Sequence, residues 1–128
     1  MKYLLLIYMK EDAMTPAERE SCYAESTQLC HELQSRGQFV SANPLQSVAT
    51  ASSVRVREGK RMVTDGPFAE TREQLGGYFL VDADDLNTAI SIAARIPAAK
   101  KGTVEIRPIL ELPGLPESAA AVAAEVPS

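Results

Sequence analysis

Apolar residues recur along the chain with two different periods, which predicts an alternation of strands and helices. A two-residue period predicts a short hairpin with strands at 53–57 and 61–64, in which valines alternate with charged residues, so that the ribbon is half exposed. Segment 2–9, KYLLLIYM, is apolar on both faces of a strand. Four longer strands are predicted at residues 2–9, 38–45, 76–81 and 103–110.

Two segments carry helix-start and helix-stop signals. The run TPAE at 15–18 predicts a helix start, with the threonine as N-cap and the glutamate closing a capping box. This helix should stop at Gly37, which can adopt the left-handed conformation after a helix end. A second helix should begin after Asp84 or Asp85 and end at Pro97. Both helices have an apolar stripe for packing on a sheet.

The order strand, helix, strand, hairpin, strand, helix, strand predicts an α+β fold of the ferredoxin-like type, with a hairpin inserted in an antiparallel sheet. Two helices can cover only one face of that sheet. Because strand 2–9 is apolar on both faces, we expect the uncovered face to pack against a second copy. Residues 1–111 form the expected domain, and 112–128 form a tail that is either disordered or docked on the partner.

Composition excludes several classes of partner. The chain has 128 residues and a net charge of −4, so it offers no cationic surface for nucleic acid or an anionic membrane. The longest apolar run, 4–9, is far shorter than the roughly 20 residues that span a bilayer, and it lacks signal-peptide features. We therefore expect a cytoplasmic protein. Cys22 and Cys30 lie about 12 Å apart along the first helix, beyond the reach of a disulfide.

The motif TDGPF, just after the hairpin, contains the main candidate for chemistry. Gly66 can take a positive φ and Pro67 fixes the exit from the turn, from which Phe68 is expected to enter the core. One interpretation is a purely structural turn that places the Phe68 side chain in the core. The other is that the turn presents Asp65 to a cleft as a catalytic carboxylate for general acid/base work.

Four further residues are candidates for ligand binding, each with a structural alternative. Glu70 either lines a loop that closes over a ligand or forms local ion pairs in a solvated loop. Arg107 either binds a carboxylate or phosphate or pairs with Asp65 or Glu70. Tyr8 and Tyr78 either turn their hydroxyls into a polar pocket or belong to the core.

Other kinds of site find no support in the sequence. His31 falls about 160° around the helix from Leu29 and Leu33, so it should point to solvent rather than act as a base. The chain has a single histidine and no CxxC or HExxH spacing, and we expect no metal site. It also lacks the GxGxxG and P-loop patterns, and we expect no cofactor.

The segments MKYLLLIY, TDGPFAETREQLGGYFL and DADDLNTAISIAARIPAAKKGTVEIRPI resemble the DGPF family of the YCII-related proteins over residues 1–111. This resemblance implies a ferredoxin-like dimeric α/β barrel. It also implies a protein that stands alone or acts beside extracytoplasmic-function sigma factors, and whose relatives are suspected enzymes or small-ligand binders.

In the wider YCII group, a histidine on the first helix paired with an aspartate is the suggested active dyad. The corresponding position here falls near Ser26, so the dyad is not carried over. Asp65 remains transferable within the DGPF motif, and Glu70 and Gly77 are motif members without an assigned role.

Two functions follow as hypotheses. The first is a homodimer with a small-molecule pocket near the DGPF loop, where any reaction would be cofactor-independent proton transfer or hydrolysis with Asp65 as base. The second is a non-enzymatic regulatory or interaction module that acts with a sigma factor through the outer sheet or the tail. The sequence leaves open whether the protein is an enzyme.

Overall fold

The computed structural model of the chain describes residues 1–116. Its order of elements matches the one predicted from the pattern. Two 3-10 helices, η1 (Val48–Thr50) and η2 (Pro97–Lys100), supplement the main elements. Over the described residues the main elements are β1 (Lys2–Met9), α1 (Pro16–Ser35), β2 (Phe39–Pro44), β3 (Ser52–Arg57), β4 (Lys60–Asp65), β5 (Gln74–Asp82), α2 (Leu86–Arg95) and β6 (Thr103–Pro108).

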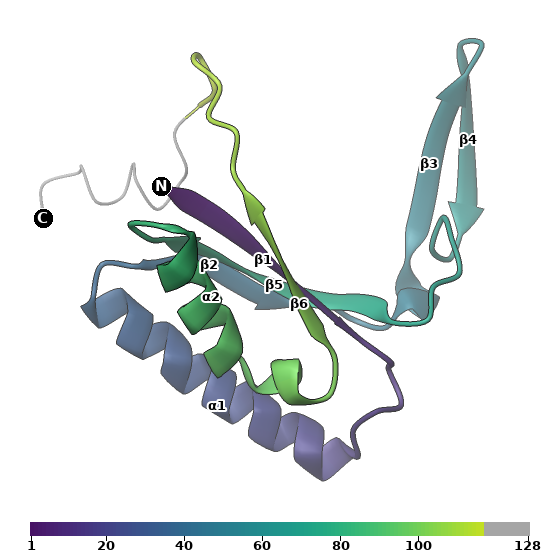
Figure 1. Cartoon of the computed structure of the whole chain (residues 1–128). Coiled ribbons are helices and arrows are strands. Elements are labelled where there is room, and N and C mark those ends of the chain that lie inside the picture. The colour runs from purple at the N-terminus through teal and green to yellow at the C-terminus, as the bar shows by residue number, and fades with distance from the viewer. Residues whose placement is uncertain (117–128) are drawn as a thin grey trace, which may run out of the picture.

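Four strands form an antiparallel sheet in the order β2-β5-β1-β6, and both helices cover the same face of it (Figure 1). This is the ferredoxin-like α+β arrangement that the sequence predicts, with an open sheet rather than a closed barrel. Leu5 of β1, Leu33 of α1 and Val81 of β5 meet in the core with no exposed surface. The other face of the sheet, which we call the open face, carries no helix (Figure 1).

The helix ends confirm the local predictions. The Thr15 hydroxyl accepts a hydrogen bond from the backbone N–H of Glu18, whose carboxylate accepts one in return from the Thr15 N–H, and so closes the capping box. Gly37 has the positive φ of 71° expected after the helix end. Asp85, rather than Asp84, caps α2 by accepting from the N–H of Thr88.

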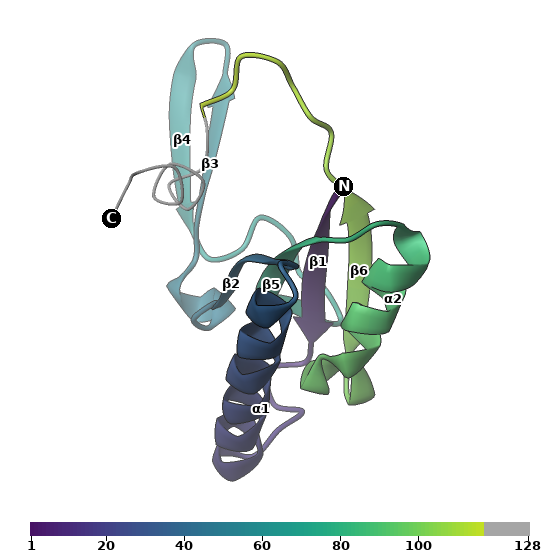
Figure 2. The ribbon, with the colours of Figure 1, turned by 90° about the vertical axis from the view of Figure 1, so that its left-hand side faces the viewer.

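The hairpin of β3 and β4 forms a separate two-stranded sheet that projects away from the helices (Figures 1 and 2). Glu58 and Gly59 both have positive φ, at 53° and 74°, which is the backbone of a tight hairpin turn. Its valines are exposed as well as its charged residues, with Val54 and Val56 each at 60%. The expectation of a half-exposed ribbon is therefore wrong, because the hairpin extends beyond any surface that could cover one side.

Phe68 is the clearest error of the sequence-based prediction. Its side chain is 79% exposed, whereas the rigid turn before it was expected to direct it into the core. The turn itself forms as predicted, with Gly66 at a φ of 96°. The hairpin carries the turn away from the helices, so that within residues 1–116 the ring does not join the core (Figure 1).

The remaining fold-level expectations concern the cysteines, the membrane and the tail. Cys22 and Cys30 are free and half-buried. Within residues 1–116, no helix combines the length and apolar character needed to cross a bilayer. Most of the predicted tail, 117–128, lies outside the described residues, and the stretch 112–116 is exposed.

Candidate functional site

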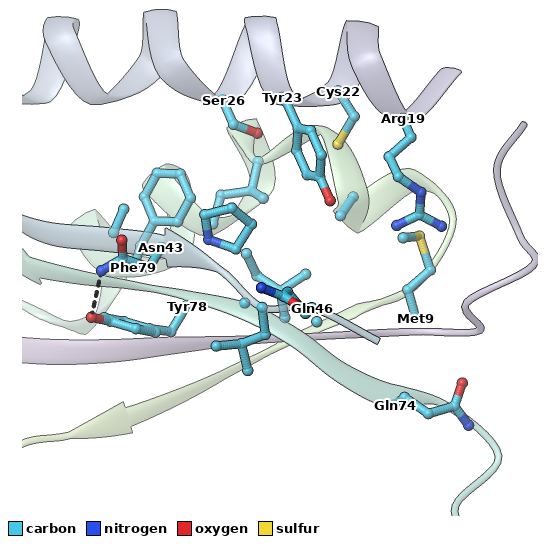
Figure 3. A pocket seen from close by; sticks show the side chains of 18 of the residues that line it. Met9, Arg19, Cys22, Tyr23, Ser26, Asn43, Gln46, Gln74, Tyr78 and Phe79 are labelled. Atoms are coloured by element: carbon cyan, nitrogen blue, oxygen red, sulfur yellow. Dashed lines mark hydrogen bonds between the residues drawn. The ribbon is translucent and has the colours of Figure 1, made fainter. Parts of the chain in front are cut away.

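A cavity of about 440 Å³ lies between α1 and the helix-covered face of the sheet (Figure 3). Its position follows from the sheet alternation, because every second residue of β1, β2 and β5 faces α1. Gly77, on β5, lets β2 lie close beside the floor: a Cβ there would lie 3.0 Å from the Asn43 carbonyl oxygen. The apolar part of the lining comes from Ile7, Met9, Ala42, Phe79, Ile96 and Ala98.

Polar side chains gather around the mouth of this cavity. Arg19, Tyr23 and Ser26 project from α1 toward the sheet, and Gln46 and Gln74 come from the loop after β2 and the start of β5 (Figure 3). Tyr23 is 43% exposed, so its ring stands at the boundary between the cavity and solvent. The site therefore has an apolar interior and a polar entrance.

Glu11, in the loop after β1, holds the mouth in place. Its carboxylate accepts hydrogen bonds from the Val48 N–H at 2.7 Å and from the Ser47 hydroxyl at 2.8 Å. These two bonds, with the nearby Arg19 charge, lower the pKa of Glu11. The backbone carbonyl of Glu11 in turn accepts a bond of 2.6 Å from Arg19 Nη2. One residue thus joins β1, α1 and the loop before the hairpin.

Arg19 is the main cation at the cavity. Its guanidinium makes only that one hydrogen bond, and no ion pair, within residues 1–116. Because a guanidinium carries five N–H donors in a fixed plane, most of its capacity stays available to a ligand. The half-buried position of Arg19 at the entrance allows it to contact a ligand seated on the apolar floor.

The two cysteines also line the cavity. Burial raises the pKa of the Cys22 thiol, an effect that a hydrogen bond with Ser26 partly opposes. Burial likewise raises the pKa of Cys30. Both thiols are therefore neutral near pH 7 and not activated as nucleophiles. Ser26 stands at the helix position where the wider group is expected to have its histidine, so that position does face the cavity here.

The predicted site residues do not converge. Asp65 is the last residue of β4 and Glu70 follows in an exposed loop, and neither lines the cavity. Arg107 is exposed on the open face, opposite Leu4 in the strand register, and forms no ion pair with Asp65 or Glu70 in the described chain. Asp65, Glu70 and Arg107 therefore lie outside the cavity between α1 and the sheet.

The two tyrosines differ in their placement. Tyr8 lines a shallow depression on the open-face side, together with Arg72 and Glu105. Tyr78 lies on β5 beside the main cavity, with its ring along the sheet (Figure 3). The Tyr78 hydroxyl accepts bonds from Ser41 Oγ at 3.4 Å and Asn43 Nδ2 at 3.0 Å, which lower its pKa. Tyr78 thus borders the cavity, but it alternates with Gly77 and Phe79, so its side chain lies on the open face with Leu6 and Leu80.

Sequence reasoning missed the residues that α1 contributes. Arg19, Cys22, Tyr23 and Ser26 follow a spacing of three and four residues and so share one helix face, which was a usable signal. The contribution of Gln46 had no such signal, because it depends on how the loop after β2 folds back. No cluster of three or more His, Cys, Asp or Glu side chains placed to hold a metal occurs within residues 1–116.

The fold and cavity together define a ferredoxin-like α+β protein with a site between helix and sheet. The model of the YCII-related domain matches residues 1–113, and the chain belongs to this family. It is also similar to an uncharacterised protein of Rhizobium meliloti (strain 1021), with 33% identity over 118 residues that cover 85% of this chain and 92% of the relative. The resemblance inferred from the DGPF segment is therefore confirmed.

Proposed function

We propose that the protein binds a small organic acid with an apolar body in the cavity between α1 and the sheet. The observation that supports this proposal is the cavity itself, whose volume of about 440 Å³ falls in the range of small-molecule sites. Its floor consists of aliphatic and aromatic side chains, which favour an apolar ligand body. The Arg19 guanidinium at the mouth would hold the acidic group by paired hydrogen bonds.

This placement changes the role that the sequence suggested for the DGPF segment. A pocket near the DGPF loop was expected to contain Asp65, whereas the cavity is lined from α1, β1, β2 and β5. Within residues 1–116 the carboxylate that lines the cavity is Glu11, which is already held by the Ser47 hydroxyl and the Val48 N–H, and the two cysteine thiols are neutral. Binding is therefore the proposed activity, and catalysis by Asp65 stays a separate hypothesis that requires a ligand outside this cavity.

The proposed functional unit is a cytoplasmic homodimer in which two open faces pack together as a dimeric α/β barrel. Leu4, Leu6 and Leu80 occupy the open face and remain partly exposed in the single chain. Beyond β6, the segment 109–116 continues on the side of the open face (Figure 1), and its Leu110 and Leu112 are 80% and 55% exposed. Apolar side chains that are left on an open sheet face support burial by a second copy.

A ligand screen tests the binding proposal. Medium-chain and aromatic carboxylic acids are compared with the matching alcohols by thermal shift, and hits are measured by titration calorimetry. We expect the acids to bind about tenfold more tightly than the alcohols, because only the acids pair with Arg19. Arg19→Gln should remove this difference, whereas Arg107→Gln, a cation outside the cavity, should leave it unchanged.

Equal binding of acids and alcohols by the wild type would refute the acid specificity, and the absence of any hit would refute the binding site. Cavity filling gives an independent check, since Ala42→Leu should weaken every ligand while the protein stays folded. Asp65→Ala tests the separate catalytic hypothesis: if it abolishes binding without unfolding, Asp65 belongs to the site after all.

The alternative function is a non-enzymatic regulatory or interaction module that works with an extracytoplasmic-function sigma factor. The exposed hairpin, with Phe68 at its exit, favours this alternative, because exposed apolar groups are a feature of interaction surfaces. Co-purification of the sigma factor with the wild type, but not with Phe68→Ala, would support it. Retained binding by Phe68→Ala would remove the observation on which it depends.

A further inference from the structure

We propose that the β3–β4 hairpin clasps a second copy of the chain, with its valine face laid over the outer edge of that copy's sheet. This inference rests on the proposed homodimer and adds a contact that the packing of open faces alone does not require. The edge in question consists of β6 and the segment 109–116 that follows it.

The first argument concerns the stability of the hairpin. Its two strands pair only with each other, and within residues 1–116 no other element packs substantially against it. A two-stranded ribbon of this kind is only marginally stable in water, since it has no third layer to bury its apolar side. The hairpin nevertheless has a defined turn and register from Ser52 to Asp65. A partner that covers it would account for both observations.

The second argument is that the hairpin has two chemically different faces. Residues directly opposite in the register share a face, which places Val54 with Val63 and Val56 with Arg61 on one side. These valines are 59–60% exposed. Arg55 is opposite Met62, and Arg57 is opposite Lys60, so the other side is mainly basic. The valine face is the side suited to burial, and the basic face suits solvent or a neighbouring acidic surface.

Charge and position point to a second copy of the chain as the occupant. The hairpin tip carries Arg55, Arg57, Lys60 and Arg61 against the single acid Glu58, although the whole chain has a net charge of −4. The outer edge is largely apolar with a small excess of acid: it carries exposed Glu105, Arg107 and Glu111, and three exposed leucines, Leu110, Leu112 and Leu115. The hairpin and segment 109–116 rise from opposite ends of the sheet on the side of the open face (Figure 1). A second copy seated on that face would meet both.

The test compares two conservative variants of the hairpin. Val54→Thr with Val56→Thr keeps the branched side chains that favour strands but removes the apolar contact. Met62→Thr, on the basic face, is the matched control because its side chain is 46% exposed and equally remote from the core. Sedimentation velocity over a dilution series gives the dimer dissociation constant of each protein. We expect the double variant to raise it at least about tenfold, and the control to change it less than about twofold.

A second measurement locates the contact without any mutation. Zero-length carboxyl-to-amine cross-linking of a mixture of ¹⁵N-labelled and unlabelled wild type should join Lys60 of one copy to Glu105 or Glu111 of another. Links from Lys60 that occur only within one copy would overturn the inference, as would a double variant that dimerises like the wild type. Either result is compatible with the proposed homodimer. A wild type that sediments only as a monomer would contradict both the homodimer and the hairpin contact. The preference for acids over alcohols, measured at one protein concentration for every variant, tests the cavity separately.

Discussion

The helix-and-sheet body and the β3–β4 hairpin are built from the same kinds of residues but differ in what supports them. Leu33 and Val81 in the body have no exposed surface, while Val54, Val56 and Val63 in the hairpin keep more than half of theirs. The hairpin's register and turn are as regular as those of the body. Regular backbone geometry therefore does not imply burial. The buried side chains of the body stabilise the single chain, whereas the exposed valines of the hairpin are available for contact with another molecule.

Truncation of a core leucine should give the largest effect. Leu33→Ala leaves a cavity between α1 and the sheet and should lower the free energy of unfolding by about 2–5 kcal/mol. Val56→Ala, in the hairpin, should lower it by less than about 1 kcal/mol in the monomer. Urea unfolding at low protein concentration measures both. Similar losses for the two variants would contradict the contrast between body and hairpin.

The glycines at two turns extend the contrast to the backbone. At Gly102, a Cβ would lie 2.1 Å from the Tyr8 carbonyl oxygen, so Gly102→Ala should force β6 away from β1 and cost about 1–3 kcal/mol. At Gly59, where φ is 74° and nothing lies within 4 Å, the alanine variant strains only the hairpin turn. Hydrogen exchange should show faster opening at β1 and β6 in the first variant and only at β3 and β4 in the second.

Loss of single side-chain hydrogen bonds should give smaller effects. Thr15→Ala removes the cap of α1 and should lower the free energy of unfolding by about 1 kcal/mol. Ser53→Ala removes the bond of 2.8 Å that its hydroxyl donates to the Gly66 carbonyl at the root of the hairpin. This second variant should leave the thermal midpoint within error while hairpin amides exchange faster. A lowered midpoint for Ser53→Ala would show that the hairpin belongs to the cooperative unit.

The smallest expected effect depends on pH. The Lys101 ammonium, together with the Thr15 hydrogen bonds, lowers the pKa of Glu18 from 4.5 to about 2. A carboxyl with a depressed folded-state pKa contributes stability above its unfolded value, and that contribution is lost as pH falls from about 4.5 to about 2. Glu18→Gln should therefore make the thermal midpoint depend less steeply on pH over this interval. Glu20→Gln, on the exposed side of α1, should keep the wild-type slope of thermal midpoint against pH. The same slope in Glu18→Gln would show that Glu18 does not cause this pH dependence.

The contrast also explains what the sequence could predict. The ends of α1 and α2 depend on contacts within a few residues, such as Thr15 with Glu18, and these were predicted correctly. The order of elements followed from apolar periodicity, which reflects burial against one sheet. Phe68 was misplaced because its burial depends on the direction of the hairpin, which no local pattern determines. Whether Phe68 is buried thus depends on tertiary structure, which the residues of the turn alone do not determine.

The cavity was hard to predict for a related reason. Met9, Arg19, Gln46 and Gln74 lie far apart in the sequence and meet only when the loop after β2 folds under α1. The DGPF motif drew attention to Asp65 because it concentrates turn-forming and ionisable residues. In the structure Asp65 ends β4 and Glu70 follows in an exposed loop, so this polar stretch lies apart from the side chains that line the cavity.

Glu11 contacts both the entrance of the cavity and the loop that leads into the β3–β4 hairpin. Its carboxylate holds Ser47 and Val48, and a few residues later the Ala51 carbonyl accepts from the Gly66 N–H at 2.6 Å. Any ligand that shifts Arg19, and any partner that shifts the hairpin, must act on the same short loop. The proposed ligand and the proposed second copy would then be linked reciprocally, and we expect the apparent ligand affinity to depend on the total protein concentration.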